Sequence, residues 1–150
     1  MSKWLVKSEP NVYSIDNLKK DKKTLWDGVR NYQARNFLKE MKKGDQIIFY
    51  HSATEPIGIA GLATVSSQAI ADPSQFDKRS KYFDEKATKD SPRWFSPELK
   101  FLEKFNELVP LSKLKKQNEL KDMQLLRRGN RLSVMPVTDK EFKSILKLAK

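Results

Sequence analysis

The sequence contains no cysteine, a single histidine, five glycines and no long hydrophobic run. Without cysteine it forms no disulfide and no thiolate zinc site, a composition that suits a reducing compartment. No apolar run approaches the roughly 20 residues needed to cross a bilayer. The N-terminal stretch MSKWLVKSEP is too short and too polar for a signal peptide. We therefore expect no membrane association and a cytoplasmic protein, or a nuclear one if the source is eukaryotic.

Motifs for metal and phosphate chemistry are also missing. The carboxylates are scattered, and no set of ligands has the spacing of a metal site. Neither GxxxxGKS, GxxxxGKT nor GxGxxG occurs, so a glycine-rich loop that cradles phosphate is not indicated. We expect no metal and no cofactor.

The single histidine, His51, stands beside Tyr50 and Ser52 at the end of a predicted strand. Serine-type catalysis requires a base, a nucleophile and an orienting acid to converge. The sequence shows no such arrangement, so a hydrogen-bonded structural or binding role is favoured for His51 over catalysis.

Positive charge is abundant. The 150 residues include 30 Lys+Arg against 19 Asp+Glu, a formal net charge of +11. Such a balance favours a polyanionic partner, because each phosphate contact releases condensed counterions. A lysine-rich solvated surface would have the same composition, so charge alone does not decide. The length and the 38% hydrophobic content fit one globular domain over residues 1–150.

Hydrophobic periodicity predicts short strands mixed with helices, without a regular βαβ repeat. The predicted strands are 4–6, 46–51, 57–65, 94–106 and 132–137. The predicted helices are a short one capped by Ser14, one at 32–43 between Asn31 and Gly44, one or two turns within 112–128, and a last one opened by a Thr138/Glu141 capping box. The fold class is therefore α+β, with a small, curved, mostly antiparallel sheet flanked by helices.

Three irregularities are expected in this sheet. Gly58 and Gly61 indicate bulges or a close backbone approach. Pro97 indicates an edge strand, a bulge or a late strand start. The polar, turn-rich residues 72–92 form a long loop, and loops of this length in compact domains are usually functional or mobile.

The stretch WDGVRNYQARNFL at 26–38 places Trp26 beside a turn, just ahead of a helix. Three interpretations compete for this tryptophan: a core anchor, part of a catalytic loop, or a platform on which a nucleic acid base stacks. Arg30 and Arg35 either are solvated or ion-paired surface charges, with Asp27, Glu40 or Asp45 as possible partners, or they contact phosphate or stack beside the base. Asn31 is either a helix cap or a hydrogen-bonding partner for the edge of a base.

Five motifs together resemble the EVE domain, a PUA-like family. They are WLVKSEP at 4–10, WDGVRNYQARNFL at 26–38, GDQIIFYHS at 44–52, GIAGLATV at 58–65 and RRGNRLSVMPVT at 127–138. The resemblance covers nearly the whole chain in order. The FSPEL segment at 95–99 departs from it, since the family usually has an uninterrupted strand there.

The resemblance implies a barrel-like sheet of five or six strands flanked by helices, and a relationship to YTH domains, which hold a methylated base in an aromatic cage. It also implies a reader of modified bases in DNA or RNA that binds without turnover. Two alternatives remain: a binder of a small nucleotide-like molecule, or an enzyme acting on a nucleobase with His51 as acid or base.

The resemblance implies a set of site residues as well. Trp26 corresponds to the wall on which the base stacks. The remaining pocket residues it implies are Lys7, Ser8, Asn31, Arg35, Tyr50, His51 and Ser52, with Tyr82, Phe83 or Trp94 as the second wall. Basic side chains at the rim would hold phosphates. The candidates for that role are Arg30, Arg127, Arg128 and Arg131.

Overall fold

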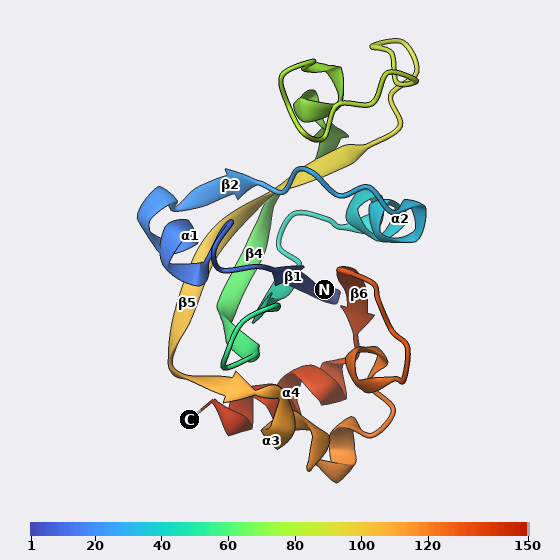
Figure 1. Ribbon diagram of the computed structural model, residues 1–150. Helices are drawn as coiled ribbons and strands as arrows, with labels where there is room; N and C mark the ends of the chain where they lie inside the picture. The colour runs from blue at the N-terminus through green and yellow to red at the C-terminus, as the bar shows by residue number, and fades with distance from the viewer. Residues whose placement is uncertain (150) are drawn as a thin grey trace.

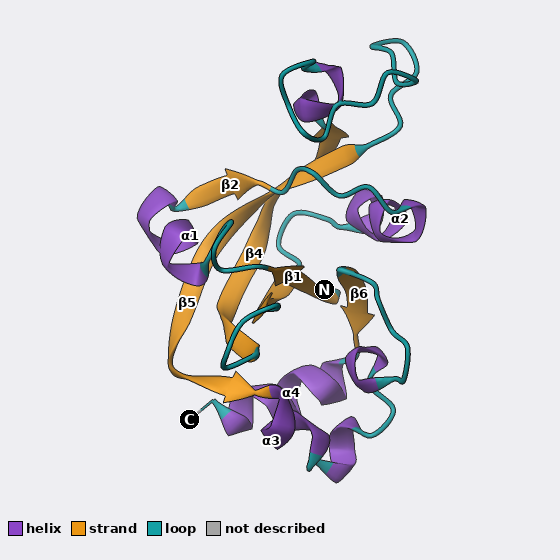
Figure 2. Ribbon diagram, viewed as in Figure 1, coloured by secondary structure: helices purple, strands orange, loops and turns teal. Residues whose placement is uncertain are grey.

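The computed structural model describes residues 1–149, which form one six-stranded mixed sheet flanked by α-helices (Figure 1). The strands are β1 (Lys3–Ser8), β2 (Lys23–Leu25), β3 (Gln46–His51), β4 (Gly58–Ala71), β5 (Phe95–Pro110) and β6 (Val134–Val137), in the order β2-β5-β4-β3-β1-β6. β1 pairs with β3 in parallel, and every other pairing is antiparallel. The predicted α+β class with a curved, mostly antiparallel sheet is confirmed (Figure 2).

The helices cover the two faces of the sheet. They are α1 (Ile15–Asp21), α2 (Tyr32–Glu40), α3 (Leu111–Lys115) and α4 (Asp139–Leu148), with 3₁₀ turns at Pro73–Phe76, Asn118–Leu120 and Gln124–Leu126. One hydrophobic core joins α1 and α2 to the face of β3 that carries Phe49. The other joins α3 and α4 to the face that carries Ile48. None of the helices in residues 1–149 is long and apolar enough to cross a membrane.

Three of the helices begin directly after the capping residues that were predicted from the sequence. Ser14 and Thr138 both form the reciprocal capping box, and the Asn31 side chain accepts a hydrogen bond from the Ala34 amide. The predicted end of the helix at 32–43 is wrong, because Met41 has extended backbone angles and α2 stops at Glu40. β2 was not predicted, since its lysine-containing sequence has little strand character.

β4 and β5 are longer than predicted and cross the molecule as a bent ribbon (Figure 1). Their pairing shifts register beside Pro97, which confirms the bulge among the predicted alternatives. A Cβ atom on Gly58 would lie 2.2 Å from the Val109 carbonyl oxygen, and one on Gly61 would lie 2.3 Å from that of Glu103. Both glycines therefore permit the close backbone approach that bends the ribbon.

The far ends of β4 and β5 carry residues 72–94, which form a lobe that projects from the sheet (Figure 1). The lobe is built from turns around the Pro73–Phe76 3₁₀ helix. The Gln75 amide lies at its centre. Its nitrogen donates to the carbonyls of Asp72 and Trp94, and its oxygen accepts from the Arg93 and Trp94 amides. The long polar segment of the sequence is thus an ordered unit held by buried polar groups.

Candidate functional site

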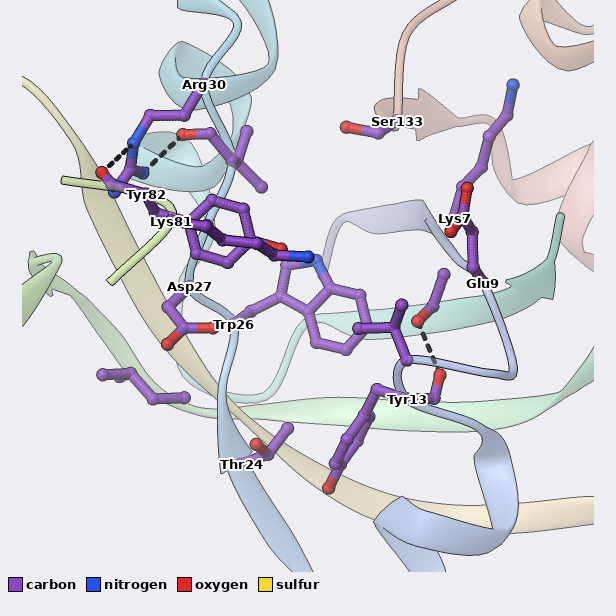
Figure 3. A pocket seen from close by; sticks show the side chains of 15 residues that line it. Lys7, Glu9, Tyr13, Thr24, Trp26, Asp27, Arg30, Lys81, Tyr82 and Ser133 are labelled. Atoms are coloured by element: carbon purple, nitrogen blue, oxygen red, sulfur yellow. Dashed lines mark hydrogen bonds between the residues drawn. The ribbon is translucent and has the colours of Figure 1, made fainter. Parts of the chain in front are cut away.

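A cavity of about 470 Å³ opens between the end of β1, the exit of β2 and the part of the lobe that carries Lys81 and Tyr82 (Figure 3). Four segments far apart in the sequence build its walls. The lining residues are Lys7, Ser8, Glu9, Val12, Tyr13, Thr24, Leu25, Trp26, Asp27, Gly28, Val29, Arg30, Lys81, Tyr82 and Ser133.

Trp26 is both a core residue and a wall of this cavity. Its ring is only 8% exposed and packs edge-on against Phe49, with 5.5 Å between ring centroids, and against Tyr13 at 6.3 Å. Its amide donates to the Pro97 carbonyl, which extends the pairing of β2 with β5 past Leu25. The interpretation as a core anchor is therefore confirmed, and the same indole also borders an open space.

Gly28 lets the lobe approach the Trp26 segment. Its φ is +80°, and an added Cβ would lie 2.7 Å from the Tyr82 ring. Its amide donates to a carboxylate oxygen of Asp72 at 2.8 Å. A side chain at position 28 would be strained and would also displace Tyr82 from the cavity wall.

Arg30 ties the lobe to this segment. A guanidinium has five N–H donors, and the structure gives each of them a partner. These are Tyr82 O twice, Val29 O, Asp72 Oδ2 and Ser74 Oγ, at 2.7–3.0 Å. The phosphate contact predicted for Arg30 does not fit this geometry, because no donor is left. Arg30 instead positions Tyr82.

Asp72 is the buried partner of Arg30, and its side chain is fully buried. Burial on its own would raise the pKa of Asp72. The hydrogen bonds that it accepts from Ser74, Gly28 and Arg30 outweigh this effect and hold the pKa below its usual range. The carboxylate is therefore charged and fully engaged, and the junction between lobe and sheet is an ion pair with little access to solvent.

Lys7 and Ser8 lie at the end of β1, as predicted, and both line the cavity. The Lys7 ammonium lies 5.9 Å from the centre of the Tyr50 ring, and burial lowers its pKa. The Ser8 hydroxyl donates to the Tyr13 carbonyl at 2.5 Å. Its proton is thus engaged, while its oxygen can still accept a hydrogen bond.

The sequence did not single out Asp27, Lys81 or Glu9, and it named Tyr82 only as one of three candidates for the second wall. All four line the cavity. Partial desolvation, and to a smaller extent repulsion by Asp72, raise the pKa of Asp27. Its position next to Trp26 in WDG could have pointed to it. No local pattern marks the lobe residues, because only the tertiary fold brings them here.

Asn31, Arg35 and Trp94 are not among the residues that line the cavity. Asn31 caps α2 through its side-chain oxygen. Trp94 is buried and stacks on Tyr32 with 4.9 Å between ring centroids, and the Arg35 guanidinium lies 4.8 Å from the Tyr32 ring centre. These residues support the outside of the lobe junction rather than the cavity wall.

Tyr50, His51 and Ser52 follow the same pattern and are absent from the cavity lining. Tyr50 is buried beneath Lys7. The Ser52 amide donates to the Ser8 carbonyl. The His51 Nε2 atom accepts a hydrogen bond from the Ile15 amide at 3.1 Å, so the imidazole holds the start of α1.

Arg127, Arg128 and Arg131 lie on the exposed connection between the Gln124–Leu126 turn and β6. No hydrogen bond or ion pair involves their guanidinium groups within residues 1–149. The same connection ends at Ser133, which lines the cavity. Three cations without a hydrogen-bonding partner in that range therefore stand on a segment that leads into the cavity.

No group of three or more metal-ligating side chains occurs among the residues described.

The chain forms an α+β domain of basic composition with an open cavity beside Trp26, and comparison with known proteins identifies its family. The model of the EVE domain matches residues 2–148, so the chain belongs to the EVE domain family. Thymocyte nuclear protein 1 of Homo sapiens is 40% identical over 165 residues, covering 98% of this chain and 73% of the relative. The Danio rerio protein of the same name is 41% identical, covering 98% and 71%.

Solved structures agree with this assignment. A crystal structure of a protein from Pseudomonas syringae is 44% identical, with a TM-score of 0.97, and the match covers 99% of this chain and 100% of that one. The crystal structure of human THYN1 protein in complex with DNA containing 5-methylcytosine is 39% identical, with a TM-score of 0.93. That match covers 100% of this chain and 98% of the human one.

The bond between His51 and Ile15 predicts a pH effect on stability. Burial and, to a smaller extent, Lys104 lower the pKa of His51, while Asp16 partly opposes them. Between the folded pKa and the unfolded value of about 6.5, the unfolded chain binds more protons, so stability falls as the pH drops below about 6.5. Thermal unfolding of His51→Gln, whose amide oxygen accepts without titrating, should vary less between about pH 7.5 and 5 than that of the wild type. If the unfolding temperatures of the wild type and of His51→Gln change with pH in parallel, the bond between His51 and Ile15 is not the source of the pH effect.

The donors of Arg30 predict that lysine cannot replace it. A lysine lacks the planar fork and leaves buried acceptors on Asp72 and Tyr82 unpaired, so Arg30→Lys should destabilise the protein by about 1–3 kcal/mol. Amide exchange around Tyr82 should also accelerate. The control is Arg79→Lys, since the Arg79 side chain is 95% exposed. Wild-type protection of the lobe in Arg30→Lys would refute the positioning role.

Proposed function

We propose that this protein is a non-enzymatic reader that binds DNA carrying a modified base, and that the base leaves its stack and enters the cavity beside Trp26. The observation that carries the proposal is an indole fixed by Phe49 and Tyr13 at the wall of an open cavity. The volume of about 470 Å³ lies within the range of small-molecule sites.

The energetics of base extrusion fit such a site. Taking a base out of a duplex costs a few kcal/mol. Stacking on an aromatic ring returns about 1–3 kcal/mol. Because Trp26 is already immobilised by the core, it loses little side-chain entropy on binding. Hydrogen bonds to polar groups of the wall, such as the Ser8 oxygen, supply the rest.

Tyr82 is the best candidate for the second aromatic wall. It lines the cavity, whereas Phe83 and Trp94 do not. Arg30 holds its carbonyl oxygen twice, and the contact with Gly28 fixes where its ring can lie. In this proposal the base lies between Tyr82 of the lobe and Trp26 (Figure 3).

The similarity to the human relative supports DNA with a modified base as the ligand, because that protein was crystallised with DNA containing 5-methylcytosine. The animal relatives carry the word nuclear in their names, and a nuclear location would fit the same ligand. Binding without turnover is supported by His51, whose Nε2 atom is committed to the backbone of α1. RNA with a modified base is the alternative that a binding screen would separate.

The stacking role of Trp26 predicts a graded loss of affinity. Trp26→Leu should weaken binding to an oligonucleotide with one 5-methylcytosine by about 5- to 150-fold, the equivalent of 1–3 kcal/mol, and Trp26→Phe should weaken it less. Fluorescence polarisation measures the affinities, and circular dichroism verifies folding. Trp4→Leu is the matched control, since Trp4 is similarly buried but does not line the cavity. Equal losses at both positions would count against stacking.

The arginine connection predicts a change in salt dependence. Replacing Arg127, Arg128 and Arg131 by glutamine should reduce the slope of log affinity against log salt by about 0.9 for each duplex phosphate that the protein no longer neutralises. The ratio of affinities for modified and unmodified DNA should stay as in the wild type, because phosphate contacts carry no sequence information. The control variant replaces Lys113, Lys115 and Lys116 at α3 by glutamine. If the slope of the arginine variant equals that of the wild type, the DNA backbone does not run along the arginine connection.

A further inference from the structure

We infer that Asp27 reads the edge of the bound base and makes the site selective for 5-substituted cytosines over thymine. This inference rests on the proposed function, because it assigns a role to a residue in the same cavity. It goes further by naming the group that recognises the base and the competing base, thymine, that this group excludes.

The position of Asp27 suits this role. It follows Trp26 directly in the chain and lines the same cavity. Figure 3 shows its carboxyl group beside the Trp26 indole. A base stacked on an aromatic ring presents its hydrogen-bonding edge sideways, so a polar group that flanks the ring can reach that edge.

The Asp27 carboxyl group also has no partner from another residue in the described part of the chain. The oxygens of Asp45 accept from the Trp4 indole and from the Ser2 and Lys42 amides, and those of Asp72 are equally occupied. Within residues 1–149, by contrast, the Asp27 side chain accepts no hydrogen bond from another residue and forms no ion pair. Nearby Arg30 has no donor to spare. The hydrogen bond that lowers the pKa of Asp27 comes from its own backbone amide, so acceptor capacity on the carboxyl group remains for a ligand.

The chemistry of the two pyrimidines makes a carboxylate discriminating. Cytosine presents an N4 amino donor at the position where thymine has the O4 acceptor. The 5-methyl group of 5-methylcytosine is also present in thymine, so a methyl pocket cannot separate the two bases. A carboxylate accepts from the N4 amino group and repels O4. The hydroxyl groups of Thr24 and Ser133, which also line the cavity, can donate or accept and so do not discriminate.

The discrimination requires the ionised carboxylate. A protonated carboxyl group would pair with either base, because it could donate to N3 of cytosine and accept from its N4 amino group, or donate to O4 of thymine and accept from its N3–H. Burial and Asp72 raise the pKa of Asp27, while a hydrogen bond from its own backbone amide and Arg30 oppose them. The preference for 5-methylcytosine should therefore be largest above that pKa.

The test compares wild type with Asp27→Asn on duplexes that differ in one base, 5-methylcytosine or thymine, each placed opposite an abasic site so that neither is paired. The wild type should prefer 5-methylcytosine by about 5- to 150-fold, the discrimination expected of a good contact with a base edge. In Asp27→Asn the ratio should fall to near one, because an amide can turn to present a donor or an acceptor to either base. Asp90→Asn, an exposed lobe residue, is the control and should keep the wild-type ratio.

The outcomes separate the inference from the function on which it rests. A wild-type protein that binds both bases equally, yet more tightly than a duplex with two opposed abasic sites, overturns the role of Asp27 and leaves the reader function in place. The role of Asp27 is also overturned if folded Asp27→Asn keeps the wild-type ratio of affinities for the 5-methylcytosine and thymine duplexes. A wild type that binds all three duplexes alike contradicts the reader function itself.

Discussion

The ion pair between Arg30 and Asp72 is the interaction on which the site depends. It joins a segment at the exit of β2 to a lobe that starts 42 residues later, with one partner fully buried. Removing one member of such a pair leaves an uncompensated buried charge, which is far more costly than losing a surface pair. The lobe side of the cavity wall therefore depends on this junction, since Arg30 holds the Tyr82 carbonyl in place.

Local patterns in the sequence predicted much of the fold. The capping residues Ser14, Asn31 and Thr138 all act at the helix starts where they were expected. These features depend on neighbours three or four residues away, which a sequence shows directly. β2 was missed because its place in the sheet is set by pairing with β5, far along the chain. Tertiary context overrode local preference there.

The candidate site was predicted less completely, for the same physical reason. Trp26, Lys7 and Ser8 do line the cavity, and each stands in a motif that is visible in the sequence. Asn31 and His51 have side chains equally suited to a base edge or to a backbone amide, and the fold uses them for amides. Tyr82 and Lys81 come from a lobe whose path no local pattern reveals. Residue type indicates what a group can bind, but only packing decides what it meets.

The two outer strands of the sheet have a consequence for the behaviour of the protein at high concentration. β2 has only three residues and begins with a lysine, and β6 has four and contains Pro136, which has no amide hydrogen. Edge strands that are short, charged or contain proline are poor templates for pairing with a strand of another molecule. Concentrated solutions of the folded protein should therefore resist edge-to-edge association of their sheets.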